Sequence, residues 1–441
     1  MTGEFSMTDE LARMARRLVL ALLLACAALA VIAGGAQAVV VTVDGHRLSY
    51  QPLRGAAERG EARPNVRSRV KPASKKGLTW HGGPVMSSNT NYAIYWDPAG
   101  GSSFPAGYEA GIDKWFGDIE HDSGSLTNTD SVLAQYHGEG STFANYDSHF
   151  AGPLIDTDPY PANGCNAAPK CFTREQIEAE LASFVQGHGL PADLQHMYFL
   201  LTPEGVESCL EEQGHSCSAG AKHAFYCMYH DYIELSKGGT IVFANAPYVP
   251  GLRCGDESNT PNNKLSDEEI AGGIAHEHSE GVTDPTLKAW YETSKGNEVA
   301  DKCRTFQEAT EYGAPLGTAE DGSKYNQLIN GDKYWYQQEW SNEAEACKQR
   351  ALGTPAVTKV APKTGPASGG TAVTISGSGF TSTSTVAFGT AAASEVVFHS
   401  PSSITATSPP GSTGVVDVRV TNGAGTSPVV SKDHFKYKKA R

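Results

Sequence analysis

Apolar and polar residues alternate along residues 77–350 with two periods, one typical of strands and one typical of helices. Three stretches have the apolar pattern of strands, NYAIYWDP (91–98), HMYFLLTP (196–203) and GTIVFANAPY (239–248). In YEAGIDKWFGDIE (108–120) the apolar residues fall on one side of a helix, and TREQIEAELASFVQGHG (173–189) is a second amphipathic helix that begins with a capping-box pattern. Strands mixed with helices predict an α/β or α+β domain over residues 77–350.

The pattern changes near residue 352, where Gly, Ser, Thr and Val become frequent. TAVTISG and VVDVRVTN alternate as strands do, and the turn signals GG, PPG and NGAG separate the runs. Residues 354–438 are long enough for one immunoglobulin-like β-sandwich, without the Cys–Trp–Cys pattern of antibody domains. The segment resembles IPT/TIG domains in Pro362, Gly365, Pro366, Gly369 and Gly370, and in SSITATSPPGSTGVVDVRVTN. That resemblance implies a module that spaces domains or binds partners.

The first 38 residues have the features of a signal peptide. Three arginines precede the apolar run LVLALLLACAALAVIAG, and Ala36-Gln37-Ala38 fits a cleavage site. A membrane anchor and a lipoprotein with a lipidated Cys26 are the alternatives. Residues 39–76 are polar and basic with few large apolar residues, and we interpret them as a disordered linker or a propeptide. The sequence therefore predicts a secreted, extracellular protein.

The charge of the chain limits its partners. Acidic residues outnumber basic ones by 49 to 35, which gives a formal net charge of −14. Such a chain does not bind nucleic acid or an anionic membrane through bulk charge, so we expect neither as a partner once the signal is cleaved. An extracellular protein or a polysaccharide remains possible.

The cysteines predict disulfide bonds. The chain has nine, and eight remain when Cys26 leaves with the signal, an even number typical of exported proteins. No C-x-x-C motif is present, which argues against a thiolate metal cluster. Pairing neighbours along the chain suggests Cys165–Cys171, Cys209–Cys217, Cys227–Cys254 and Cys303–Cys347, one of many possible connectivities.

The stretch AHEHSEGVTDP carries the candidate chemistry. A helix is expected from an N-cap at Ser266 to about Gly281. His276 and Glu280 are four residues apart, so they share one helix face and can reach the same zinc ion. Glu277 is placed, as in H-E-x-x-H peptidases, to act as the general base on metal-bound water. A charged helix face without a metal is the alternative.

Further acidic residues follow this helix. Glu298 is predicted as the third zinc ligand and Asp301 as the partner that orients a ligand histidine, although both could pair with nearby lysines instead. Asp284 is a rival third ligand. His230, in FYCMYH, is a candidate ligand or substrate-side donor, or else a packed residue. Carboxylates also leave calcium possible as the cation.

Residues ~80–348 resemble the phosphate-induced (EXORDIUM-like) family. The similarity lies in IAHEHSEGVTDPTLKAWY, NEVADKC and the closing Trp340 and Cys347, and earlier in HGGPVMSSNTNYAIYWDP and YFLLTPEGVESC. The resemblance implies an extracellular protein and favours a purposeful carboxylate at Glu280, but it implies no settled catalytic activity.

Together these features predict two domains after the signal peptide. The first is a zincin-like, disulfide-containing α/β or α+β domain, and the second is an immunoglobulin-like β-sandwich. The predicted function is that of a secreted zinc-dependent metallohydrolase of the peptidase type with an accessory IPT/TIG module. The alternative is a non-catalytic extracellular or cell-wall binding protein of the EXORDIUM-like type.

Overall fold

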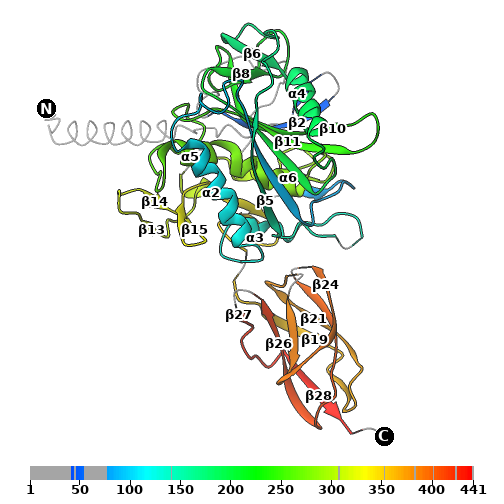
Figure 1. Cartoon of the computed structure of the whole chain (residues 1–441). Helices are drawn as coiled ribbons and strands as arrows, with labels where there is room; N and C mark the ends of the chain where they lie inside the picture. The colour runs from blue at the N-terminus through cyan, green and yellow to red at the C-terminus, as the bar shows by residue number, and fades with distance from the viewer. Residues whose placement is uncertain are drawn as a thin grey trace, which may run out of the picture.

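The computed structural model of the 441-residue chain describes residues 41–43, 46–53, 77–140, 142–305, 308–351, 353–381, 384–400, 402–422 and 425–439. The predicted signal peptide (1–38) lies outside these residues, as does 54–76 of the predicted linker or propeptide. The chain is rich in β-structure with few helices, and it ends in a separate β-sandwich (Figure 1). No helix of the described residues is long and apolar enough to cross a membrane.

A mixed ten-stranded sheet forms the centre of the first domain. Its strands are β1 (Val41–Val43), β2 (His46–Pro52), β4 (Asn89–Trp96), β5 (Ser148–Asp156), β6 (Lys170–Thr173), β7 (His196–Thr202), β8 (Val206–Cys209), β9 (Cys217–Ser218), β10 (Ala224–Glu234) and β11 (Thr240–Pro247). The order is β5-β4-β7-β11-β10-β9-β8-β6, and β2 pairs with β10 and β1. Strands β5, β4, β7 and β11 are parallel, whereas β10 runs antiparallel to β11.

Helices cover both faces of this sheet. They are α2 (Tyr108–His121), α3 (Asp130–Leu133), α4 (Arg174–Gly187), α5 (Lys264–Glu269), α6 (Ala275–Thr283) and α7 (Glu308–Glu311). In β7, Met197 and Phe199 pack in the core on the α2 and α6 side, whereas Tyr198 and Leu200 pack in the core that contains α4. A strand that is apolar on both sides is typical of the buried centre of a parallel sheet, which explains its continuous hydrophobic run.

The helix with the HEHSE motif begins earlier and is less regular than predicted. Asn263, not Ser266, is the N-cap, because its side chain accepts hydrogen bonds from the backbone N–H groups of Leu265 and Ser266. Between α5 and α6 lies a π-helical segment (Ile270–Ile274). A Cβ on Gly273 would lie 2.3 Å from the Met228 sulfur, so the glycine allows α6 to lie close against β10.

The remaining elements of the first domain are short. They are β3 (Thr79–Trp80), β12 (Trp290–Tyr291), β13 (Gly317–Thr318), β14 (Lys324–Tyr325), β15 (Gln327–Ile329), β16 (Asp332–Tyr334), β17 (Glu339–Ser341), β18 (Ala346–Lys348) and a 3₁₀ turn (Asp301–Cys303). The two-stranded pairs are β3 with β12, β13 with β14, β15 with β16 and β17 with β18.

Two sheets form the C-terminal sandwich. One contains β19 (Ala356–Ala361), β21 (Ala372–Ser378), β25 (Ser403–Thr407) and β24 (Ser394–Ser400), and the other contains β20 (Thr364–Pro366), β28 (His434–Lys438), β26 (Gly414–Asn422), β22 (Thr385–Phe388), β23 (Ala391–Ala392) and β27 (Gly425–Thr426). Alternate residues of these strands, among them Val373, Ile375, Val418 and Val420, form one core. The expected immunoglobulin-like sandwich is therefore present.

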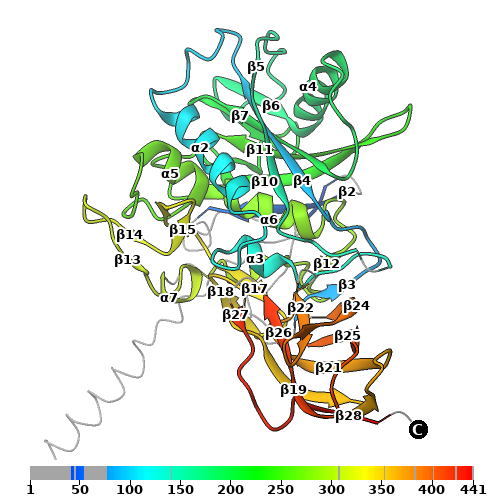
Figure 2. The ribbon, with the colours of Figure 1, turned by 60° about the horizontal axis from the view of Figure 1, so that its bottom comes forward.

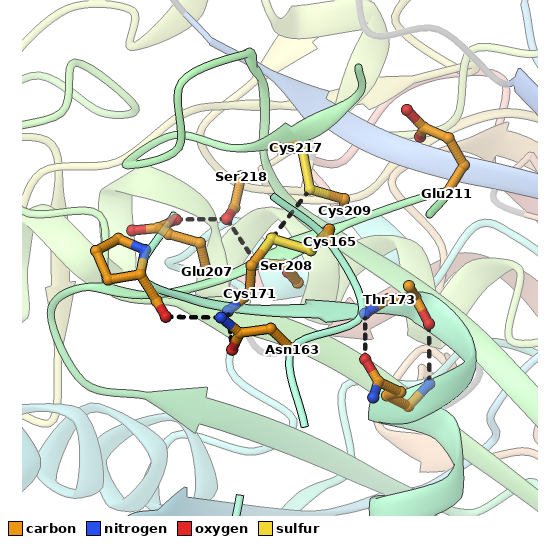
Figure 3. Close-up of a disulfide and its surroundings, with 12 residues drawn as sticks. Asn163, Cys165, Cys171, Thr173, Glu207, Ser208, Cys209, Glu211, Cys217 and Ser218 are labelled. Atoms are coloured by element: carbon orange, nitrogen blue, oxygen red, sulfur yellow. Dashed lines mark hydrogen bonds between the residues drawn. A yellow bond between two sulfur atoms is a disulfide. The ribbon is translucent and has the colours of Figure 1, made fainter. Parts of the chain in front are cut away.

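Four disulfides link segments of the first domain. They join Cys165–Cys171, Cys209–Cys217, Cys227–Cys254 and Cys303–Cys347, the same pairs that neighbour pairing suggested. The first two lie side by side, with the Cys171 and Cys209 sulfurs 3.4 Å apart (Figure 3). Four disulfides fit a protein that folds in an oxidising compartment.

The described part of 39–76 differs from the expected disordered linker. Residues 46–52 form β2, which pairs antiparallel with β10, and Leu48 and Tyr50 are buried. The segment HRLSYQPL alternates polar and apolar residues, a short period-2 pattern typical of a strand, whereas the residues that follow it are basic and polar.

Candidate metal centre

Three elements bring the predicted site residues together. Helix α6 supplies His276, Glu277 and Glu280, and it lies against β10, which supplies His230 (Figure 2). The segment before and within the 3₁₀ turn supplies Glu298 and Asp301. All six side chains are at most 1% exposed. The structure thus brings the six candidate side chains into one region, and that region is closed to solvent.

One group of possible ligands contains His276, Glu280 and Asp301, which we call the His276 group. The His276 Nε2 atom lies 3.2 Å from Glu280 Oε1 and 3.3 Å from Asp301 Oδ1. Within the described residues both contacts have the distance of ion pairs, but neither meets the full geometry of a hydrogen bond. Atoms that ligate one tetrahedral zinc ion are about 3.3 Å apart, given zinc–ligand bonds of about 2.0–2.1 Å. The spacing therefore suits a shared cation.

Gln337 determines which His276 nitrogen faces the carboxylates. Its amide Nε2 donates to the Ala300 carbonyl at 3.0 Å, so its Oε1 is turned toward His276 Nδ1, also at 3.0 Å. An amide oxygen only accepts, so Nδ1 carries a proton, and whenever the ring is neutral its lone pair is on Nε2, the atom that faces the carboxylates. That tautomer, assigned from the hydrogen-bond network, is the one required for a metal ligand, and its orientation by a second residue is common at metal sites.

A second group contains His230, Glu280 and Glu298, the His230 group. Here the two carboxylates face different ring nitrogens, since Glu280 Oε2 lies 3.7 Å from Nδ1 and Glu298 Oε2 lies 3.5 Å from Nε2. His230 Nδ1 is also 3.2 Å from Glu277 Oε2. One imidazole nitrogen can ligate one ion, so this group fits a single cation less well than the His276 group.

The electrostatics of the site reflect an excess of buried carboxylates. Burial lowers the pKa of His276, but Glu280 and Asp301 outweigh burial and raise this pKa well above its usual value. Burial raises the pKa of Glu280, but His276 reverses this and the net pKa is lowered. For Asp301, burial and the Glu280 charge raise the pKa to about 7. Glu280 and His276 thus form an ion pair when no cation is present, and Asp301 is the carboxylate left uncompensated.

Other residues of the motif have separate partners. His278 lies away from both ligand groups, with Nδ1 3.2 Å from Asp130 and Nε2 3.1 Å from Asn89 Oδ1. Asp284, the rival third ligand, accepts hydrogen bonds from the backbone N–H groups of Lys288 and Ala289, both at 2.6 Å. It therefore serves to hold the turn after α6.

Two site residues were missed from the sequence. Ser49 of β2 donates toward Glu280 Oε2 at 3.3 Å and toward Asp301 Oδ2 at 3.4 Å. Gln337 orients His276 from the YWYQQEW stretch. A polar pair between aromatic residues was a usable signal for Gln337, whereas Ser49 lay in a segment that we had interpreted as a linker.

Comparisons with known proteins define the class of the C-terminal domain. The IPT/TIG family model matches residues 355–437, which agrees with the sandwich described above. The comparisons give no support to the EXORDIUM-like resemblance of residues ~80–348. No curated protein matches the chain significantly.

Solved structures are similar to only part of the chain. The plexin A4 extracellular region is 29% identical over 19% of this chain and 8% of its own, with a TM-score of 0.17. Gamma-CGTase from alkalophilic Bacillus clarkii is 27% identical over 30% of this chain and 18% of its own, with a TM-score of 0.18. SGBP-B from Bacteroides uniformis is 22% identical over 27% and 31%, with a TM-score of 0.18. The chain spans less than a third of these structures, and such low scores say nothing about its function.

Proposed function

We propose that residues 77–350 form a secreted zinc-dependent hydrolase of the peptidase type, with a zincin-like arrangement of sheet and HExxE helix. The observation that carries the proposal is the position of the buried His276 Nε2 atom, which lies 3.2 and 3.3 Å from oxygens of two carboxylates. Without a metal ion this cluster keeps a proton on His276, and a cation that displaces the proton would bind to all three side chains.

The proposed ligands are His276, Glu280 and Asp301. This assignment exchanges the predicted roles of Glu298 and Asp301, because Asp301 lies beside His276 whereas Glu298 lies beside His230. An imidazole nitrogen favours zinc, since calcium takes oxygen ligands almost exclusively. When bound, zinc would polarise a carbonyl group and lower the pKa of bound water.

Glu277 is the proposed general base. Its Oε2 is held 3.2 Å from His230 Nδ1, and its Oε1 makes no hydrogen bond within the described residues. Burial raises the pKa of Glu277 above its usual value, which makes its carboxylate a better proton acceptor near neutral pH. Glu277 would take a proton from the attacking water and deliver it to the leaving amine, while His230 holds the carboxylate in place.

Metal analysis and two variants test the proposal. The purified protein should contain close to one zinc per chain, and His276→Ala should lose it. Glu277→Gln should keep the zinc and lose hydrolysis of a peptide library, by a factor of about 10² to 10⁴. Equal digestion by wild type and Glu277→Gln would exclude catalysis at this site, and a metal-free wild type that cannot be loaded with zinc would exclude the centre.

A non-catalytic extracellular binding protein is the second candidate. It is favoured by the burial of all six site side chains and by the IPT/TIG module, which is separate from the site. In that case the cation would only stabilise the fold. Suppose that the wild-type site is made accessible to solvent. If the protein then binds zinc but hydrolyses no peptide, the result supports this candidate.

A further inference from the structure

Strand β2 closes the candidate metal centre from the N-terminal side of the chain. It pairs antiparallel with β10, with Tyr50 opposite Tyr229 and Ser49 opposite His230. Opposite residues of an antiparallel pair project from the same face. Ser49 therefore lies on the face that carries His230, and its hydroxyl reaches the two carboxylates of the His276 group.

The face of β2 toward the site is polar and poorly satisfied. Gln51 follows two residues after Ser49 on the same face and is fully buried, yet neither atom of its amide has a hydrogen-bond partner among the described residues. A Cβ on Gly273 would lie 2.8 Å from Gln51 Oε1, so the helix that carries the site lies directly against this side chain. A buried amide without a hydrogen-bond partner reduces the stability that β2 gains in this place.

The opposite face of β2 fits apolar surroundings. Leu48 and Tyr50 are 0% and 3% exposed and belong to the core that also contains Phe243. The Tyr50 ring lies 4.8 Å from that of Phe225, and Leu53 donates its backbone N–H to the Phe225 carbonyl. The position of β2 thus provides backbone pairing along β10 and two apolar side-chain pockets, which hold residues two positions apart in the strand.

We infer that β2 is a removable covering strand, and that its place on β10 is the binding site for an extended polypeptide with apolar residues at the positions of Leu48 and Tyr50. The inference rests on the proposed hydrolase and names its substrate class. Addition of a strand at a sheet edge gives affinity through the backbone, while pockets for alternate side chains give specificity. The side chain of the incoming polypeptide at the position of Ser49 then faces Glu280 and Asp301, as the Ser49 hydroxyl does now.

The test separates β2 from the folded chain after folding is complete. A recognition sequence for a site-specific protease replaces residues 62–68, the full-length protein is purified and cut, and the N-terminal fragment is removed. Binding of a fluorescent peptide, HRLSYQPL, is then measured by anisotropy, with HRASAQPL, in which the residues matching Leu48 and Tyr50 are alanine, as the matched control. Peptide hydrolysis is measured before and after removal, in wild type and in Glu277→Gln.

The opened protein should bind HRLSYQPL at least about tenfold more tightly than the control, as expected from the loss of two apolar side chains. It should also hydrolyse extended peptides at least about tenfold faster than the uncut protein, with HRLSYQPL as a competitive inhibitor. Opened Glu277→Gln should bind the peptide equally well. Binding without hydrolysis in wild type would support the covering strand and contradict the proposed hydrolase.

Three results would overturn the inference. Uncut protein that hydrolyses peptides as fast as opened protein would show that β2 does not cover the site, and would leave the hydrolase proposal intact. Equal binding of both peptides would show that the two apolar pockets contribute nothing to peptide binding. Loss of the folded state, measured by circular dichroism when the fragment leaves, would make β2 a permanent strand of the sheet. Leu48→Asp in the uncut chain provides an independent check, because weaker packing of β2 against the core should raise the rate of peptide hydrolysis.

Discussion

Replacement of Asp301 by Asn should change protein stability in opposite directions with and without zinc. Asn keeps the size of the side chain and a carbonyl oxygen that can accept the Glu298 backbone N–H, which now donates to Asp301 Oδ2 at 3.0 Å. It removes the negative charge beside Glu280. Without a cation that charge destabilises the folded protein, whereas with zinc the Asp301 carboxylate is the proposed ligand.

The magnitude follows from the pKa of Asp301. Burial and Glu280 raise it from 3.8 to about 7, and each pKa unit corresponds to about 1.4 kcal/mol, so ionised Asp301 destabilises the metal-free protein by up to about 4 kcal/mol. A raised acid pKa means that stability falls as pH rises from about 4 to about 7.

Thermal unfolding at pH 8.5 measures this effect. With a chelator, Asp301→Asn should unfold at a higher temperature than wild type, by up to about 8–16 °C for a domain of this size. With zinc at 1,000 times its dissociation constant, wild type should gain about 4 kcal/mol that the variant largely lacks. Asp284→Asn is the matched control, because Asp284 is buried nearby but belongs to neither ligand group, and zinc should not alter its effect. An Asp301→Asn protein that is less stable than wild type in both conditions would refute the reasoning.

Three further changes test the surroundings of the site. Gln337→Leu should weaken zinc binding by about 10–100-fold, measured by competition with a chromogenic chelator, because His276 loses the acceptor that fixes its tautomer; unchanged affinity would contradict that role. Asp267→Asn should raise the free energy of unfolding by up to about 3 kcal/mol at pH 7.5, because burial raises the pKa of Asp267 to about 6. Urea titrations measure this gain in stability, and it should vanish below pH 4. Replacement of Cys303 and Cys347 by alanine should cost about 4 kcal/mol, from a sequence separation of 44, and should also weaken zinc binding.

Periodic patterns predicted the elements of the fold well where burial is regular. The amphipathic stretch 108–120 corresponds to α2, and Thr173 forms the expected capping box with Gln176 at the start of α4. The start of the motif helix was predicted wrongly. A serine followed by a glutamate three residues later resembles a cap, but the side chain of Asn263, three residues before Ser266, accepts from the Leu265 and Ser266 backbone N–H groups and begins the helix there. Where two capping signals are equally strong, tertiary packing determines which residue begins the helix.

The site could be predicted only as far as helix geometry reaches. The i, i+4 relation of His276 and Glu280 brings their side chains to 3.2 Å, and no tertiary information is needed for that. The order of Glu298 and Asp301 depends on a 3₁₀ turn that starts at Asp301, which the sequence does not reveal. Glu298 precedes this turn and Asp301 begins it, and the chain places Asp301 beside His276 and Glu298 beside His230.

The segment that delivers Asp301 is held from both sides, and this explains how a loop can complete a buried centre. Cys303 bonds to Cys347 next to β17, and the fully buried Arg304 forms an ion pair with Glu311 at 2.7 Å. On the inner side, the Asp301 backbone N–H donates to Glu280 Oε1 at 3.0 Å, so the loop and the helix share one carboxylate. We expect a loop fixed in this way to lose little entropy if a cation binds, so that the proposed cation would relieve the charge imbalance of the His276 group without a rearrangement of the backbone.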